Sequence, residues 1–170
     1  MEAVTREPRP ERQALYNSQL ETGTRAMVIL DAAYPRALDL AQLTWFDHLV
    51  VHTEDIGGPP SLHPALPGRT GELLVRRRLV EESITFMRRL HLVETVADEN
   101  GIAYRAGDDV PALVGLLRTR YATELKKCAH WLIAELGDLN QAELTARIAD
   151  RIGRWAAEFQ GEVGRPGQRG

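Results

Sequence analysis

Hydrophobic residues recur at three- and four-residue steps through most of the chain, a spacing typical of amphipathic helices. This pattern predicts a first helix over about residues 22–34, which Pro35 would end because proline cannot continue a helix. A second helix is expected after Asp39, whose carboxylate can accept free amide hydrogens of the first turn, and it would run to about His52. The two segments would form a short helical hairpin.

A long helix and a β-hairpin are expected further along the chain. The helix would span about residues 71–90, with Thr70 as its N-cap and adjoining apolar rows toward the core. Two segments suited to strands then flank the sequence Asp-Glu-Asn-Gly at 98–101. Asn-Gly is the preferred two-residue hairpin turn because both residues tolerate positive φ, so the turn is expected at Asn100-Gly101.

Three more helices complete the predicted body. A short one would be capped by Asp108 or Asp109, a second would cover about residues 119–136 and stop at Gly137, and the last would be capped by Asn140. The short helix is expected to bury Leu113, Val114, Leu116 and Leu117, and the last to bury a stripe of Leu144, Ile148, Ile152, Trp155 and Phe159.

The segment over residues 53–68 interrupts the helical pattern with four prolines and three glycines. This composition forbids a regular helix or a central strand, and loops of about this length are usually functional or disordered. Its apolar residues Ile56, Leu62 and Leu66 favour an ordered loop, because a disordered linker would not need them.

The composition fits one domain with extensions at both ends. The chain has 170 residues and a formal net charge of −3. We expect a flexible leader over residues 1–19, one winged-helix-like helical domain over 20–160 and a flexible tail over 161–170. A single cysteine excludes an intramolecular disulfide, and no apolar run approaches the roughly 20 residues of a membrane helix. These features indicate a soluble, cytoplasmic protein that does not enter a membrane.

The order of the elements resembles that of winged-helix domains, in which the helix before the hairpin is the recognition helix. The predicted fold is therefore mainly α with one small β-hairpin, a winged-helix-like core and additional C-terminal helices. The long Gly/Pro segment departs from a helix-turn-helix, which joins its two helices by a turn of about four residues. A DNA-binding winged-helix regulator that dimerises through its terminal helices stays open as an alternative function.

The long helix carries the basic patch of the sequence, because residues 69–89 contain six arginines and three glutamates. Consecutive arginines on a helix point about 100° apart, so a solvated face with ion pairs such as Arg77–Glu81 is the preferred interpretation. Acidic Asp98 and Glu99 at the hairpin tip would also repel a phosphate backbone. The candidates for phosphate or DNA contact are Arg78, Arg88 and Arg89.

Few residues suggest catalysis. His48 and His52 share an i,i+4 spacing and could bind zinc with His63, which leaves a zinc enzyme as a third hypothesis, but core or surface histidines are preferred. Cys128 sits in an apolar stripe and is expected to be a core residue, not a nucleophile. No paired-carboxylate, phosphate-loop or Gly-x-Ser-x-Gly motif occurs. We expect a non-enzymatic protein with no catalytic residue, no metal site and no cofactor.

Three stretches carry a family resemblance: LDLAQLTWFDHLVVH at 38–52, DIGGPPSLHP at 55–64 and GRTGELLVRR at 68–77. They resemble the middle component of bacterial ABC three-component systems of the Lamassu-like antiphage defence group. The likeness extends over about residues 16–136, and the Gly-Gly-Pro-Pro-Ser-Leu-His-Pro loop is its most distinctive part. The resemblance implies a non-catalytic adaptor with two partners, an SMC-like ABC ATPase and an effector, which it would bridge or restrain.

The Gly/Pro loop and the neighbouring helix are the first candidates for a partner surface, because an ordered loop on a rigid helix is a common recognition device. Trp155 and Phe159 could instead be exposed aromatic anchors for a partner, but packing onto the protein's own core is the preferred interpretation. The same preference applies to Trp45 and Trp131. The candidate partner-binding residues are Gly57, Gly58, Pro59, Pro60, Ser61, His63, Arg69, Arg76 and Arg77.

Overall fold

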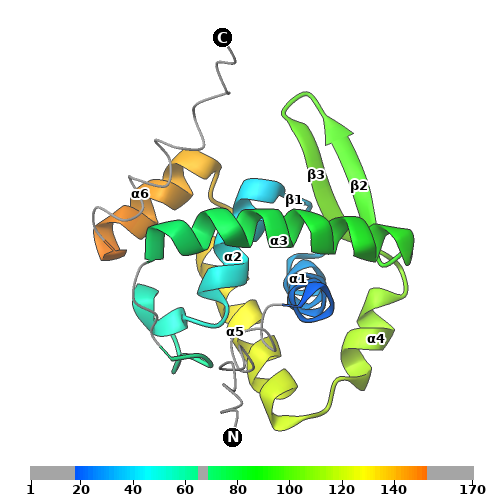
Figure 1. The fold of residues 1–170 in the computed structure, drawn as a ribbon, viewed down its shortest axis with the longest axis horizontal. Helices are drawn as coiled ribbons and strands as arrows, with labels where there is room; N and C mark the ends of the chain where they lie inside the picture. The colour runs from blue at the N-terminus through cyan, green and yellow to red at the C-terminus, as the bar shows by residue number, and fades with distance from the viewer. Residues whose placement is uncertain (1–17, 65–68, 153–170) are drawn as a thin grey trace, which may run out of the picture.

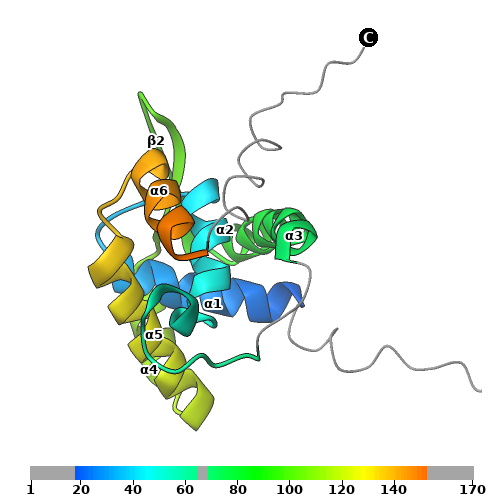
Figure 2. The same cartoon turned by 90° about the vertical axis from the view of Figure 1, so that its left-hand side faces the viewer.

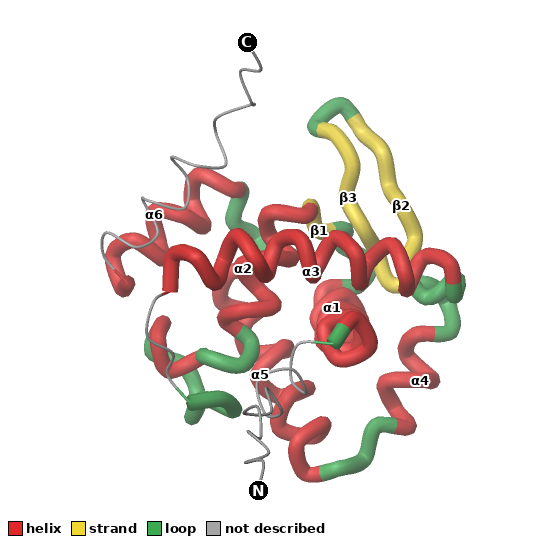
Figure 3. The backbone as a smooth tube through the Cα atoms, in the orientation of Figure 1, coloured by secondary structure: helices red, strands yellow, loops and turns green. Residues whose placement is uncertain are grey.

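The computed structural model describes residues 18–64 and 69–152, and within them the side chains of 18–64 and 75–150. The described part is mainly helical and contains a small three-stranded antiparallel sheet, which confirms the predicted fold class at that level (Figures 1 and 3). In chain order the elements are α1 (Gln19–Ala33), β1 (Leu38–Asp39), α2 (Leu40–Leu49), the 3-10 helix η1 (Thr53–Ile56), α3 (Arg69–Arg89), β2 (Val93–Asp98), β3 (Gly101–Ala106), α4 (Val110–Leu116), α5 (Arg120–Leu136) and α6 (Gln141–Ile152).

Capping side chains set the starts of the first two helices. The Ser18 hydroxyl accepts the amide of Glu21 at α1, and Asp39 and Gln42 form a reciprocal capping box at α2. Both predicted helices are therefore confirmed, although α2 ends at Leu49, three residues early. The amide of His52 donates back to the carbonyl of Leu49, so the chain leaves α2 through a tightened turn.

The sheet has the order β1-β3-β2, with both pairings antiparallel. The predicted hairpin is confirmed, but its turn lies one residue earlier than expected. Asp98 pairs with Gly101, so Glu99 and Asn100 form the turn and Gly101 follows it at a φ of 120°. The Asp98 carboxylate stabilises this turn by accepting the Asn100 amide at 2.8 Å. Strand β1 was not predicted, because a two-residue strand has no visible period.

Helix α1 forms the centre of the fold and packs against α2, α3, α4 and α5 (Figures 1 and 2). Helix α3 crosses one side of α1 and α2 and leads into the hairpin. It begins at Arg69, so Thr70 lies inside the helix and is not its N-cap. The largest completely buried side chains include Trp45 and Phe46 of α2, which confirms the core position preferred for Trp45.

For the last three helices, the predicted positions agree with the structure better than the predicted buried residues do. Asn140 caps α6 as predicted, Thr119 caps α5 although the sequence indicates only a helix over about residues 119–136, and Leu144 and Ile148 are buried. In α4 the side chain of Asp109 does not cap the helix. The prediction of burial is wrong for two leucines of α4, because α4 turns that side to solvent: Leu113 and Leu116 are exposed.

Some predictions concern residues that the structure does not describe. The tail over 161–170, residues 1–17 of the leader, Leu66, Trp155, Phe159 and the side chain of Ile152 lie outside the described residues. Within the described part, no helix combines the length and the apolar character that crossing a bilayer requires.

Candidate partner-binding site

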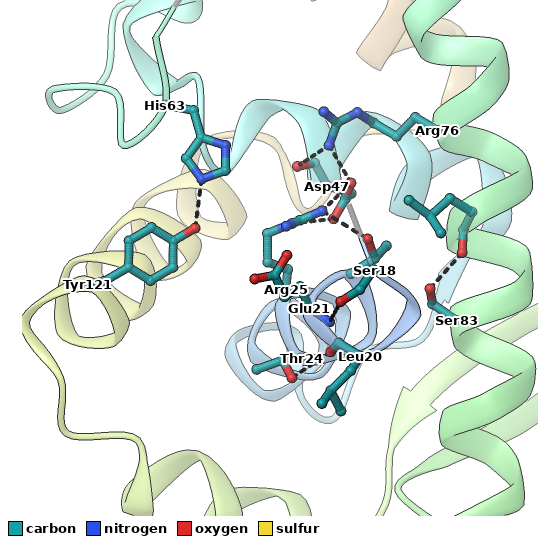
Figure 4. Close-up of polar contacts among 12 residues, drawn as sticks. Ser18, Leu20, Glu21, Thr24, Arg25, Asp47, His63, Arg76, Ser83 and Tyr121 are labelled. Carbon is teal, nitrogen blue, oxygen red and sulfur yellow. Dashed lines mark hydrogen bonds and ion pairs between the residues drawn. The ribbon is translucent and has the colours of Figure 1, made fainter. Parts of the chain in front are cut away.

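Three charged side chains meet inside the protein and join the helices that carry the candidate site. The carboxylate of Asp47 on α2 lies between the guanidinium groups of Arg25 on α1 and Arg76 on α3 (Figure 4). Arg25 donates from Nε to Asp47 Oδ1 at 2.7 Å, and Arg76 donates from Nη1 to Oδ2 at 2.5 Å and to the Asp47 carbonyl oxygen at 3.3 Å. We call these residues the ionic cluster.

The ionic cluster is shielded from water, because Arg25, Asp47 and Arg76 are only 4%, 1% and 7% exposed. Burial by itself raises the pKa of Asp47, but the charges and hydrogen bonds of the two arginines outweigh it and hold the pKa below its ordinary value. Asp47 is therefore ionised at neutral pH. Arg76 was predicted to lie on the partner surface. The structure corrects this prediction, because the Arg76 side chain is buried and points inward to Asp47.

The Gly/Pro segment is ordered over residues 53–64 and folds back on the end of α2. The Thr53 hydroxyl donates to the Pro59 carbonyl at 2.7 Å, and the Ser61 hydroxyl accepts the Glu54 amide at 3.1 Å. The amides of Leu62 and His63 both donate to the Val51 carbonyl. These bonds confirm an ordered loop over its described part. We call residues 53–64 the Gly/Pro loop.

Two glycines fit the Gly/Pro loop to its support. Gly57 ends η1 with a φ of 79°, a left-handed conformation that favours glycine. A Cβ atom on Gly58 would lie 2.6 Å from ring carbons of Trp131 on α5, so only glycine permits this approach. Trp131 is half-buried and packs against the core. The loop is thus seated on an aromatic ring of α5.

The outer face of the Gly/Pro loop is available to a partner. Gly57 and Pro60 are exposed, while Gly58, Pro59, Ser61 and His63 are half-buried. Beside the loop lies a hollow of about 210 Å³ between η1, α5 and α6. It is lined by Ile56, Gly57, Trp131, Glu135, Leu136, Arg147 and Ile148.

His63 ties the end of the Gly/Pro loop to α5. Its Nε2 lies 2.9 Å from the hydroxyl oxygen of Tyr121, and the two rings are stacked (Figure 4). Burial, reinforced by the positive charges of Arg25 and Arg76, lowers the pKa of His63 to about 4. His63 is therefore neutral at physiological pH and acts in this contact as a hydrogen-bonding ring.

The structure brings the other two histidines close to His63. The ring centroids of His48 and His52 are 4.5 Å apart, and those of His52 and His63 are 6.1 Å apart. His48 Nε2 also lies 3.7 Å from a carboxylate oxygen of Asp55. Over residues 18–64 and 69–152, however, no three histidine, cysteine or acidic side chains are arranged to hold a metal ion. The geometry therefore offers no support for the zinc hypothesis.

Cys128 is not poised for chemistry. It is buried, and burial raises the pKa of its thiol above the ordinary value although a contact with the Thr53 hydroxyl acts in the opposite direction. A thiol that stays protonated at neutral pH is a poor nucleophile. Its predicted place in the core is confirmed.

The remaining candidate arginines of α3 lie in different surroundings. Arg77 is half-buried, and Arg78 is exposed and pairs with Glu82 at 3.2 Å instead of the predicted Arg77–Glu81 pair. Arg88 and Arg89 are exposed at the C-terminal end of α3, about 30 Å from its start (Figure 1). The side chain of Arg69 lies outside the described residues. Arg88 and Arg89 are therefore separated along α3 from Arg77 and Arg78, which lie near its middle.

Sequence reasoning missed Arg25, Asp47, Tyr121 and the seat provided by Trp131. A usable signal existed for the first two, because each charge adjoins an apolar run: Arg25 precedes Ala-Met-Val-Ile-Leu and Asp47 follows Trp-Phe. A charge in such a segment needs a buried partner. No comparable signal linked Tyr121 to His63, since 58 residues separate them.

Comparison with protein families gives one match. The model described as ABC-three component (ABC-3C) system Middle Component 2 matches residues 15–158, which include the Gly/Pro loop, the ionic cluster and the hairpin. Comparisons with curated proteins and with solved structures gave no match.

We expect a large loss in the free energy of unfolding when the negative charge of Asp47 is removed from the ionic cluster. Asp47→Asn leaves two buried guanidinium groups without their counter-charge, and we expect a loss of about 3–5 kcal/mol in the free energy of unfolding. The matched control is Asp138→Asn, because Asp138 pairs with Arg36 at 2.8 Å but is 84% exposed. That change should cost about 0–1 kcal/mol. Urea denaturation measures both, and equal losses would contradict the assigned role of Asp47.

The lowered pKa of His63 predicts that the free energy of unfolding falls in mild acid. The unfolded chain binds a proton at this residue near pH 6.5 and the folded chain only near pH 4, so acidification through this window favours unfolding. His63→Gln should flatten the dependence of the unfolding free energy on pH between these values. The exposed His130 provides the control, and His130→Gln should leave the dependence unchanged. Urea denaturation across the window tests this, and a profile unaffected by His63→Gln would refute it.

Proposed function

Because the chain belongs to the ABC-three component system Middle Component 2 family, we propose that it is a non-catalytic adaptor. In this proposal it links an SMC-like ABC ATPase to an effector in a bacterial antiphage defence complex in the cytoplasm. The family match supports membership in a system of several components, and the identities of the ATPase, the effector and the defence role are parts of the proposal. Any contact with nucleic acid would occur mainly through the assembled complex.

The exposed Gly/Pro loop is the observation that carries the adaptor proposal. Thr53, Ser61 and the Val51 carbonyl hold its backbone, so binding a partner costs little conformational entropy. Exposed Gly57 and Pro60 present backbone without bulky side chains, which allows a partner surface to approach closely. The adjacent hollow beside Trp131 could receive a side chain of that partner.

The chemistry of the described side chains supports a role without catalysis. Cys128 is buried with a raised pKa, and His63 is engaged with Tyr121. The charges of Arg25, Asp47 and Arg76 are directed at one another in the interior, where they stabilise the fold.

We also propose that the core is a winged helix. The order α1-β1-α2-α3-β2-β3 is that of a winged helix, and pairing of β1 with β3 completes its three-stranded sheet. The Gly/Pro loop replaces the short turn that DNA-reading members place between their second and third helices. This order also favours a DNA-binding regulator as the second candidate, with Arg88 and Arg89 toward phosphates. The acidic turn at Asp98 and Glu99 weighs against it.

Co-expression with the ATPase and effector encoded beside the gene tests the adaptor proposal. The tagged chain should co-elute with both proteins on size exclusion. Pro60→Glu places a charge on the exposed loop and should weaken recovery of the complex by about tenfold or more, as for a central interface residue. Pro111→Glu is the matched control, because Pro111 is also an exposed proline and lies on α4.

Two results would contradict the proposal in different ways. If the wild-type chain elutes alone, it is not an adaptor for these proteins. If the complex forms but Pro60→Glu and Pro111→Glu behave alike, the Gly/Pro loop is not the surface that binds the partner.

A further inference from the structure

Strand β2 forms an open edge of the sheet. The order β1-β3-β2 gives it a neighbour on one side only, and the hairpin projects from the helical body with β2 on its outer side (Figures 1 and 3). Its sequence, Val-Glu-Thr-Val-Ala-Asp, contains no proline or lysine, the residues that commonly block pairing at such edges.

The hydrogen bonding of the hairpin shows which backbone groups face outward. In an antiparallel ladder, hydrogen-bonded and non-hydrogen-bonded pairs alternate. The Gly107 amide donates to the Leu92 carbonyl at 2.9 Å, so the next bonded pairs are Glu94–Arg105 and Val96–Ala103. The amide and carbonyl groups of Val93, Thr95 and Ala97 therefore point away from β3, toward the open edge.

A groove runs along this edge. It has a volume of about 670 Å³ and is bounded by the end of α3 and by β2, with no residue of β3 among its lining residues. Its walls are Thr85, Arg88 and Arg89 from α3 and Val93, Glu94 and Thr95 from β2. Glu94 pairs with Arg105 at 2.9 Å, so its negative charge is already balanced. Arg88 and Arg89 of α3 therefore give the groove a net positive charge.

The chain itself contains a segment that complements this groove. The opposite end of β2 carries Asp98 and Glu99, both exposed. If a second copy of β2 runs antiparallel along the first, its acidic end lies beside the basic end of α3. The same contact forms twice, because a two-fold axis relates the copies.

Charge also selects the register between two such strands. Only residues with outward-facing backbone groups can bond across the edge, so Thr95 can lie opposite Val93, Thr95 or Ala97 of the other copy. Thr95 opposite Val93 places Glu94 opposite Glu94, and Thr95 opposite Ala97 places Glu94 opposite Asp98. Both registers place like charges directly opposite each other. Thr95 opposite Thr95 avoids this and sets Glu94 against Val96.

We propose that two copies of this chain pair through the outer edges of β2, antiparallel about a two-fold axis at Thr95. The two sheets become one six-stranded sheet, and Asp98 and Glu99 of each copy lie beside Arg88 and Arg89 of the other. Since the interface is short, association is expected to be weak and reversible. This dimer is independent of the adaptor proposal, since it is measured on the chain alone.

Sedimentation equilibrium of the full chain tests the edge pairing. Wild type should show a reversible monomer–dimer equilibrium. Thr95→Pro removes an outward amide while proline remains tolerated at a sheet edge, and it should weaken the dimer by about tenfold or more. Thr95→Val keeps the amide and should retain the dimer. A monomeric wild type, or equal dimerisation of the two Thr95 variants, would overturn the proposal.

A charge exchange tests the partner contacts. Variant one is Arg88→Glu with Arg89→Glu, and variant two is Asp98→Lys with Glu99→Lys. Each should be monomeric alone, because like charges then meet twice. Their mixture should form a heterodimer, because both contacts regain opposite charges, and this result also shows that both variants are folded.

Other occupants of the groove would give different results. A mixture that stays monomeric while each variant remains folded by circular dichroism would overturn the proposal. So would a monomeric wild type that binds a DNA duplex or a poly-glutamate peptide through Arg88 and Arg89, because the groove would then serve phosphates or another protein.

Discussion

The buried carboxylate of Asp47 is the constraint on which the arrangement of the first three helices depends. Its charge is stabilised in the interior only while Arg25 and Arg76 both remain in place, since an unpaired buried charge costs several kcal/mol. One residue of the cluster belongs to each of α1, α2 and α3. A shift of any of these helices would separate charges that water cannot reach. The ionic cluster thus adds a directional requirement to apolar packing, which is itself non-directional.

This requirement positions both ends of α3. The Gly/Pro loop leaves α2 a few residues after Asp47 and is seated on Trp131 and Tyr121 of α5. The hairpin follows the other end of α3, where Arg88 and Arg89 are exposed. The Gly/Pro loop and the open edge of β2 are thus separate surfaces carried by one core. In the two proposals above, the helical core is the support, the Gly/Pro loop binds a partner, and the β2 edge pairs with a second copy of the chain.

The sequence predicted what depends on local chemistry. The caps at Asp39 and Asn140 and the existence of the hairpin are confirmed, because each is determined within a few residues. The errors concern tertiary context. Arg76, Arg77 and Arg78 are equivalent in the local sequence, and Arg76 faces inward because Asp47 lies on another helix. No local pattern shows that partner. The exposed leucines of α4 and the pairing of β1 with β3 were missed for the same reason.

Hydrogen–deuterium exchange of the chain alone and in the assembled three-component complex tests whether a rigid core presents the Gly/Pro loop to a partner. If the core is rigid and the loop binds the partner, residues 57–63 should exchange more slowly in the complex, with the exchange of α1, α2 and the middle of α3 unchanged. Slower exchange confined to residues 113–121 around the end of α4, with the Gly/Pro loop unaffected, would contradict it. So would a general change across α1, α2 and α3, because the core would then rearrange on binding.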